Sequence, residues 1–180
     1  MSFSQEIKKS IGGDEYYSPQ NVVDMIVPYI KADKRFKKIW CPFDTEDSRF
    51  VQTFQKEGYE VEFGHISTGQ DFFKIEEPLG DVVVSNPPFS KRNDVFMHLF
   101  YLNVPFALVM NFNGLFDSKS RVTMFNSYGV ELIVPSGRMK FIHQGETEAN
   151  HPNFQSVYVC NRILNRQAIN YNRIEFFGEF

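Results

Sequence analysis

The chain has 180 residues, 42% of them hydrophobic, which suffices for one compact domain with a core but not for a second large one. Its formal net charge of −3 argues against a protein that coats duplex DNA by charge alone, because that mode needs a large excess of lysine and arginine. The apolar runs are of strand length and the first residues are polar, so we expect a soluble, cytoplasmic protein with no membrane partner.

Hydrophobic spacing predicts helices and strands that alternate along the chain. A first helix is expected over residues 20–30, with Ser18 as N-cap and Pro19 at the first helical position. Further helices are expected over residues 48–57, 94–102 and 117–127. Strands are expected over residues 38–41, 59–63, 81–85, 106–111, 130–134 and 155–163, with an edge strand over 173–177.

This alternation predicts an α/β fold with a mostly parallel sheet and helices on both faces. In such sheets, ligands bind beyond the carboxyl ends of the strands. Residues 145–153 are polar and are expected to form a loop, either functional or passive. Cys41 and Cys160 lie in apolar segments and are expected in the core, and His143 and His151 are an isolated pair, so we expect no metal site.

The tetrapeptide Asn86-Pro87-Pro88-Phe89 directly follows the apolar strand 81–85. A bare Asn-Pro-Pro is often only a turn that stops a strand, but here it falls where an α/β sheet places its ligands. The Asn86 side-chain carbonyl and the Pro87 backbone carbonyl can accept hydrogen bonds from the two N–H groups of an amine, on a backbone that the prolines fix. Phe89 offers a flat face to an acceptor ring.

With this motif the chain resembles the class I S-adenosylmethionine-dependent amino-methyltransferases, of the small phage or bacterial type, whose motif is Asp/Asn-Pro-Pro-Phe/Tyr/Trp. The resemblance implies a Rossmann-like methyltransferase fold, S-adenosyl-L-methionine as cofactor, and transfer of a methyl group to adenine N6 in a nucleic acid. It makes Asn86, Pro87, Pro88 and Phe89 the expected catalytic residues. An N-terminal segment, residues 1–36, would pack on the cofactor site.

Three more segments match the family in the same order. Tyr16-Tyr17-Ser18-Pro19 resembles the family's Tyr-x-Thr-Pro segment, which implies that Tyr17, Ser18 and Pro19 lie beside the methionine end of the cofactor. Asp71-Phe72 resembles the family's acidic-aromatic pair for the cofactor adenine. Phe141 and Phe154 resemble a late aromatic segment that packs near the target base.

The loop after strand 38–41 departs from the family, because residues 42–48 contain no glycine where the family has a Gly-rich turn. Pro42, Asp44 and Asp47 are nevertheless expected at the cofactor. Either acid can accept the ribose hydroxyls, or both only cap the next helix. A second departure is Gly64-His65, where the family often has an acid for the ribose.

Basic residues are candidates for phosphate contacts. Lys91 and Arg92 follow Phe89, and they either meet the phosphates beside a flipped nucleotide or begin a solvated helix. Arg138 and Lys140 share this ambiguity, and the run over residues 31–38 is either a basic patch or a solvated face.

The acceptor stays open between adenine in DNA, adenine in RNA and a protein glutamine amide, with DNA favoured. A catalytically degenerate binding module of the same fold is the alternative that the glycine-free loop supports. No large target-recognition domain is visible in the sequence, so recognition falls to loops or to a partner subunit.

Overall fold

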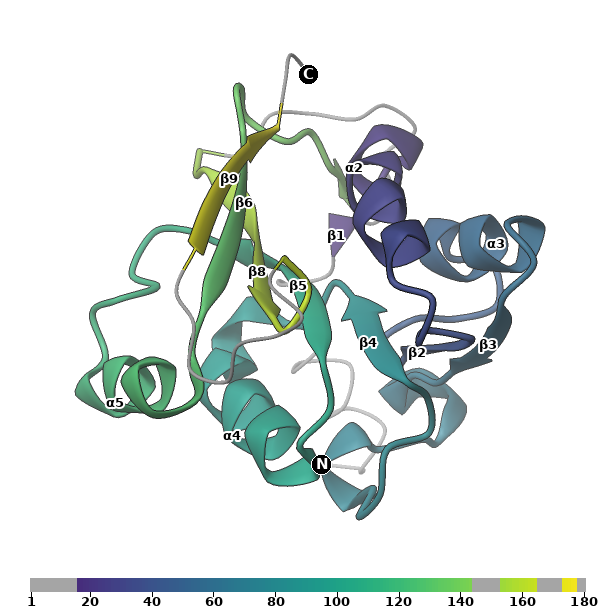
Figure 1. Cartoon of the computed structure of the whole chain (residues 1–180), viewed down its shortest axis with the longest axis horizontal. Helices are drawn as coiled ribbons and strands as arrows, with labels where there is room; N and C mark the ends of the chain where they lie inside the picture. Colours follow the sequence, from purple (N-terminus) through teal and green to yellow (C-terminus); the bar gives the residue numbers. More distant parts are fainter. Residues whose placement is uncertain (1–15, 144–152, 165–172, 178–180) are drawn as a thin grey trace, which may run out of the picture.

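A twisted sheet forms the centre of the molecule in the computed structural model, which describes residues 16–143, 153–164 and 173–177 (Figure 1). Its seven strands lie in the order β3-β2-β4-β5-β8-β6-β9, and a separate two-stranded ribbon pairs β1 with β7. The strands of the large sheet are β2 (Lys38–Cys41), β3 (Glu60–Phe63), β4 (Val82–Ser85), β5 (Phe106–Asn111), β6 (Glu131–Pro135), β8 (Ser156–Asn161) and β9 (Arg173–Phe177). The ribbon consists of β1 (Tyr16–Tyr17) and β7 (Ile142–His143).

Within the described residues, all strands of the large sheet except β8 run in one direction. β2 pairs in parallel with β3 and β4, β4 with β5, and β6 with β9. β8 is inserted antiparallel between β5 and β6. The expected α/β fold with a mostly parallel sheet is confirmed.

Helices cover both faces of this sheet, as expected. They are α2 (Gln20–Ala32), α3 (Arg49–Lys56), α4 (Arg92–Leu102) and α5 (Lys119–Tyr128), together with the short 3-10 helices η1 (Ile66–Thr68), η2 (Phe72–Lys74) and η3 (Phe89–Lys91). Figure 1 shows α2 and α3 near one end of the sheet and α4 and α5 beneath the other strands.

Alternate residues of the strands divide the core into two clusters. The α2/α3 core joins those helices to one face of the sheet, through residues such as Ile39, Val84 and Tyr158. The α4/α5 core joins the other helices to the opposite face, through neighbours such as Trp40, Val83 and Val159. Because successive strand residues point to opposite faces, a single strand contributes to both cores.

Helix α2 begins at Gln20 as expected, but its N-cap residue is Pro19 and not Ser18, and this correction concerns the candidate site. Pro19 is the N-cap residue and makes no side-chain cap, while its carbonyl accepts from Val22 N at 3.1 Å. Ser18, the predicted N-cap, instead uses its hydroxyl in a contact described below. Proline suits this place because the first N–H groups of a helix have no partner within it.

No helix among the described residues is long and apolar enough to cross a membrane.

Candidate active site

Asn86 lies at the carboxyl end of β4 and contacts the N-terminal segment. Its Nδ2 donates to Ser18 Oγ at 3.2 Å across 68 positions of sequence. Ser18 is buried with 9% of its surface exposed, and Asn86 and Pro88 are half-buried. The structure therefore brings a residue predicted for the cofactor into contact with the residue predicted to hold the acceptor amine.

The neighbouring Asp44 joins three elements through its carboxyl group. Ser48, the N-cap of α3, donates to Asp44 Oδ1, and Ser85, the last residue of β4, donates to Asp44 Oδ2. Ser48 Oγ also accepts from Phe50 N at 3.1 Å, so the same hydroxyl caps the helix. We call Ser48, Asp44 and Ser85 the serine clamp. It connects the loop after β2 directly to the residue that precedes Asn86.

Burial sets the protonation of this clamp. Asp44 is 9% exposed, and burial raises its pKa from 3.8 to about 6, while the hydrogen bonds from Ser48 and Ser85 lower it. Desolvation penalises the charged carboxylate more strongly than two hydroxyl donors stabilise it.

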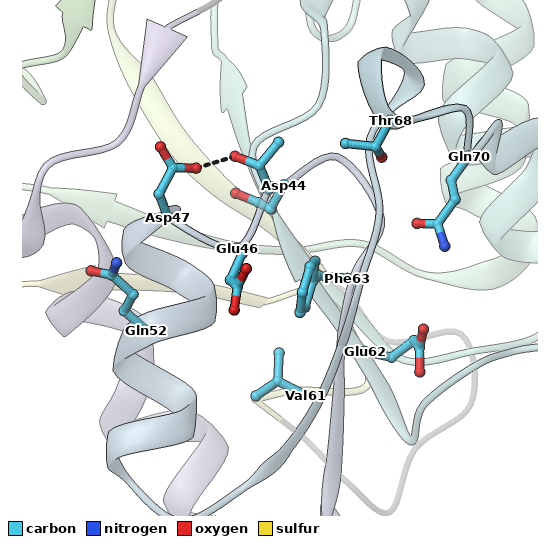
Figure 2. A pocket seen from close by; sticks show the side chains of 10 residues that line it. Asp44, Glu46, Asp47, Gln52, Val61, Glu62, Phe63, Thr68 and Gln70 are labelled. Atoms are coloured by element: carbon cyan, nitrogen blue, oxygen red, sulfur yellow. Dashed lines mark hydrogen bonds between the residues drawn. The ribbon is translucent and has the colours of Figure 1, made fainter.

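A hollow of about 980 Å³ opens beside the clamp, along the edge strand β3 (Figure 2). In Figure 2, Glu46, Asp47 and Gln52 lie on the side of α3, Thr68 and Gln70 on the side of η1, and Val61 and Phe63 between them. The lining also includes Asp44, Thr45 and Glu62. Four carboxyl groups and no basic side chain line the hollow, which favours a ligand with hydroxyl donors or positive charge.

A glycine that lets other groups come close to the backbone lies at the end of β3 and not in the loop after β2. Asp44 N donates to Gly64 O at 3.0 Å, and Gly64 N donates to Cys41 O at 3.2 Å. The Gln70 side chain fills the space that a Cβ on Gly64 would occupy. Gly64, which appeared as a departure from the family's pattern, thus permits the packing of Gln70 at the rim of the hollow.

The other residues predicted for the cofactor lie around this region in different settings. Asp47 lines the hollow, and its Oδ1 accepts the Thr45 hydroxyl. Pro42 is buried, and Tyr17 is 50% exposed in β1. Asp71 follows the lining residue Gln70 but does not itself line the hollow, and its Oδ1 caps η2 by accepting from Phe73 N at 3.1 Å.

Phe72 and Phe141 are core residues in this structure. Phe72 is 5% exposed, with its ring 4.7 Å from that of Phe43 and 5.6 Å from that of Trp40. Phe141 is 2% exposed in the α2/α3 core, beside the β1–β7 ribbon. Ligand contact through either ring would require movement of its neighbours.

Phe89 and Phe154, predicted to lie near the target base, are in contact. Their rings meet edge to face, with centroids 5.7 Å apart and an interplanar angle of 87°. Phe89 is 7% exposed and Phe154 is half-buried. The pairing places residue 154, which is distant in sequence, beside the Asn-Pro-Pro motif.

Basic residues divide between the two edges of the sheet. Lys91 is exposed directly after Phe89, whereas Arg92 donates from Nη1 to Asn113 O at 2.9 Å and so holds the loop after β5. The basic run at residues 31–38 lies near the amino end of β2, at the opposite edge. There Lys31 pairs with Glu57 at 2.6 Å and Lys38 with Glu60 at 3.0 Å, so this run behaves as a solvated, paired face.

Sequence reasoning missed several lining residues of the hollow. Glu62 and Gln70 are the informative ones, because Glu62 supplies an acid from within β3 where none was found after the strand. Alternation in Glu60-Val61-Glu62-Phe63 marks Glu62 as outward-facing, which was the available signal. Among the described residues, no group of three or more histidine, cysteine, aspartate or glutamate side chains is arranged to hold a metal ion. His151 and residues 145–152 of the expected loop lie outside the described residues.

No protein-family model matches the chain, and no curated protein matches its sequence. Among solved structures, it is similar to a modification subunit of a putative type I restriction enzyme from Vibrio vulnificus YJ016, with a TM-score of 0.49, 12% identity, and coverage of 97% of this chain and 49% of that one. It is also similar to the M protein of the type I restriction enzyme EcoKI, with a TM-score of 0.45, 12% identity, and coverage of 86% and 45%. The chain spans less than half the length of both, and at this identity its site residues must be assigned from their own geometry.

Proposed function

We propose that the chain binds S-adenosyl-L-methionine and transfers its methyl group to an exocyclic amino group, with adenine N6 in a nucleic acid as the acceptor. The observation that carries this proposal is the contact between Asn86 and Ser18 at the carboxyl edge of the sheet. It joins the segment assigned to the cofactor with the motif assigned to the acceptor. The serine clamp ties the acidic hollow to the same point.

The acceptor amine is assigned to Asn86 and Pro87. A ring-conjugated amine is a poor nucleophile because its lone pair is delocalised, and two carbonyl acceptors on its N–H groups favour the reactive geometry. Ser18 accepts from Asn86 Nδ2, which fixes the orientation of the amide, and the amide oxygen is of the acceptor type that an N–H donor requires. Pro87 and Pro88 restrict the backbone that carries the second carbonyl.

The acidic hollow is assigned to the cofactor. Its volume of about 980 Å³ lies at the upper end of the range of small-molecule sites, and its carboxylates suit the ribose hydroxyls and the positive charge of this cofactor. Asp47, Glu62 and Gln70 are the residues that we assign to its polar groups. The sulfonium supplies the electrophilic methyl group, so the residues of the chain need only bind and orient.

The same tests distinguish this proposal from two other functions. A protein glutamine amide presents the same N–H geometry as adenine, and Phe89 favours a planar base over it only through its ring. A degenerate module would bind cofactor or nucleic acid without turnover, as the glycine-free loop over residues 42–48 favours.

The decisive experiment compares Asn86→Ala with the wild type and with Asn126→Ala, an exposed position on α5. Methyl transfer is followed with labelled cofactor on adenine-containing single-stranded DNA and RNA, with nucleoside analysis of the product. We expect Asn86→Ala to lower turnover by about 100-fold or more, since it removes a contact made to the reacting amine. Calorimetry with S-adenosylhomocysteine should give nearly unchanged affinity for both variants.

Each result has a defined meaning. If Asn86→Ala keeps wild-type turnover, the active site does not lie at residues 86–89. If label appears on protein glutamine and never on nucleic acid, the acceptor is a glutamine amide and not adenine. If the chain binds S-adenosylhomocysteine but transfers no methyl group to any acceptor, it is a degenerate binding module. If it does not bind S-adenosylhomocysteine, the cofactor assignment is wrong.

The cofactor residues are tested separately. Asp47→Ala and Asp71→Ala should each weaken binding of S-adenosylhomocysteine by about 1–3 kcal/mol, the cost of losing a charged hydrogen-bond acceptor. Because Asp47 lines the hollow and Asp71 does not, a loss confined to Asp71→Ala would move the adenosine site from the hollow toward η2.

A further inference from the structure

The loop that joins β5 to α5 leaves the carboxyl edge of the sheet beside the Asn-Pro-Pro motif. β5 is the parallel neighbour of β4, with Leu108 opposite Ser85, so residues 112–117 leave the sheet at the same edge as Asn86 and Phe89. This loop exposes two aromatic rings, with Phe112 at 40% and Phe116 at 45% exposure, 6.1 Å apart between centroids. Large exposed aromatic side chains beside a candidate site require an explanation.

A chain of contacts connects these rings to the acceptor motif. Phe112 N donates to Gln155 O at 2.7 Å, and Gln155 follows Phe154, whose ring meets that of Phe89. Phe89 and Phe154 therefore form one ring pair and Phe112 and Phe116 a second, and the two pairs are joined through the backbone of residues 112 and 154–155. Phe89 is buried, Phe154 is half-buried, and Phe112 and Phe116 are exposed.

Two arginines hold the backbone of this loop. Arg121 is 5% exposed and donates from Nε to Leu115 O at 2.6 Å, and also to Gly114 O and to Asn93 Oδ1. Arg92 donates to Asn113 O at 2.9 Å, as described above. With these carbonyls held, both rings are presented with little conformational freedom left to lose on binding.

Among the described residues, exposed cations lie in the segments that adjoin these rings. Lys91 is exposed after Phe89, and Arg138 and Lys140 are exposed in the segment that Gln155 contacts through Gly137 O, at 3.0 Å. Asp117 at the end of the loop carries a negative charge. Aromatic faces with cations beside them are the chemistry that binds unpaired bases and their phosphates.

We propose that Phe112 and Phe116 form a stacking shelf for the unpaired bases that flank the target nucleotide. This inference rests on the proposed function and deepens it, because it makes single-stranded or locally opened nucleic acid the bound form. Stacking is tolerant of sequence, so the shelf adds affinity and position without specifying the neighbouring bases.

The test is an anisotropy titration with a labelled thymidine oligonucleotide of roughly a dozen nucleotides that carries one central adenine. Phe112→Ala and Phe116→Ala should each weaken binding by about tenfold. Phe112→Leu and Phe116→Leu keep apolar packing, including the side of Phe116 that faces Phe125, but remove the stacking face, and should weaken binding similarly. Tyr101→Ala is the matched control, since this 71% exposed ring lies on α4 toward the opposite edge.

Abasic nucleotides on both sides of the adenine supply the second arm. They should weaken binding to the wild type about as much as the phenylalanine substitutions do, and should cost the Phe112→Ala and Phe116→Ala variants little more. Equal losses in wild type and variants, or wild-type affinity in the leucine variants, would overturn the shelf.

Methyl transfer measured on the same samples separates the two proposals. If binding depends on the two rings but no methyl group is transferred, the proposed methyltransferase function is wrong and the stacking shelf stands. If methyl transfer occurs but binding does not depend on the rings, only the shelf is wrong.

Discussion

The Asp44 carboxyl group shows how a buried charge can shape the candidate site. Its two oxygens accept hydroxyls from α3 and β4, so it fixes the distance between the hollow and Asn86. The native pKa of about 6 lies above the ordinary value of 3.8, which means that the folded protein holds this proton more tightly than the unfolded chain does.

The first prediction concerns the pH dependence of Asp44→Asn. Between pH 3.8 and 6 the unfolded chain loses the Asp44 proton first, so the wild type loses stability as pH rises through this window. At about 1.36 kcal/mol for each pKa unit, the loss approaches about 3 kcal/mol. Asparagine does not titrate. The free energy of unfolding of Asp44→Asn minus that of the wild type, from urea titrations, should therefore be larger at pH 7 than at pH 4, and a constant difference would contradict this.

The second prediction concerns Ser18, which the resemblance assigns to the cofactor and the structure places against Asn86. If its hydroxyl orients the Asn86 amide, Ser18→Ala should lower turnover by about 3- to 10-fold, the kinetic equivalent of one hydrogen bond, and leave affinity for S-adenosylhomocysteine unchanged. Ser127→Ala on α5 is the control. If Ser18→Ala loses affinity for S-adenosylhomocysteine but keeps normal turnover, Ser18 contacts only the cofactor and does not orient Asn86.

Residue types near strand ends could be predicted from the sequence, but burial could not. Asp44 and Asp47 were both predicted for the cofactor, yet of the two only Asp44 is buried, and its partner Ser85 lies 41 residues away in the sequence. Phe112 and Phe116 carried no motif at all. Their importance depends on the arginine contacts that hold the loop, which no local pattern encodes.

At the scale of elements, the expected helices and the strands of the large sheet are confirmed, with ends that shift by a few residues. β1 and β7 were missed because two-residue strands have no measurable periodicity. Hydrophobic residues alternate poorly with polar ones in β8, and the structure explains this, since all six of its residues are buried between two cores.

The third prediction concerns how β8 holds α2. Tyr158 is fully buried, and its hydroxyl donates to Val22 O at 2.8 Å across 136 positions of sequence. Tyr158→Phe keeps the ring in the α2/α3 core and removes only this bond. We expect the free energy of unfolding to fall by about 0.5–1.5 kcal/mol, as measured by urea titration. A loss above about 3 kcal/mol would instead indicate that the ring repacks and leaves a cavity.

For the whole molecule, the expected parallel sheet with helices on both faces is confirmed, while the reversed strand β8 was not foreseen. The direction of a strand in the sheet depends on the path of the connection that precedes it. The connection before β8 includes residues 144–152, and their sequence does not indicate a turn type. Among the described residues, the two cores lie on opposite faces of the sheet, so the expectation of a single domain becomes a question of whether the two faces unfold cooperatively.

The last prediction is that both cores unfold together. Trp40 is the one tryptophan of the chain and lies in the α4/α5 core, so its fluorescence reports on that side. Phe54→Ala in the α2/α3 core should cost about 3–5 kcal/mol, and Leu99→Ala in the other core about 2–5 kcal/mol. Because neighbouring residues of β2 and β4 point into opposite cores, Phe54→Ala should shift the Trp40 transition as far as it shifts the transition seen by far-UV circular dichroism. If the tryptophan transition stays at its wild-type midpoint while the dichroism transition moves, the two faces of the sheet are separate folding units. The serine clamp between the acidic hollow and Asn86 would then be lost before the sheet unfolds.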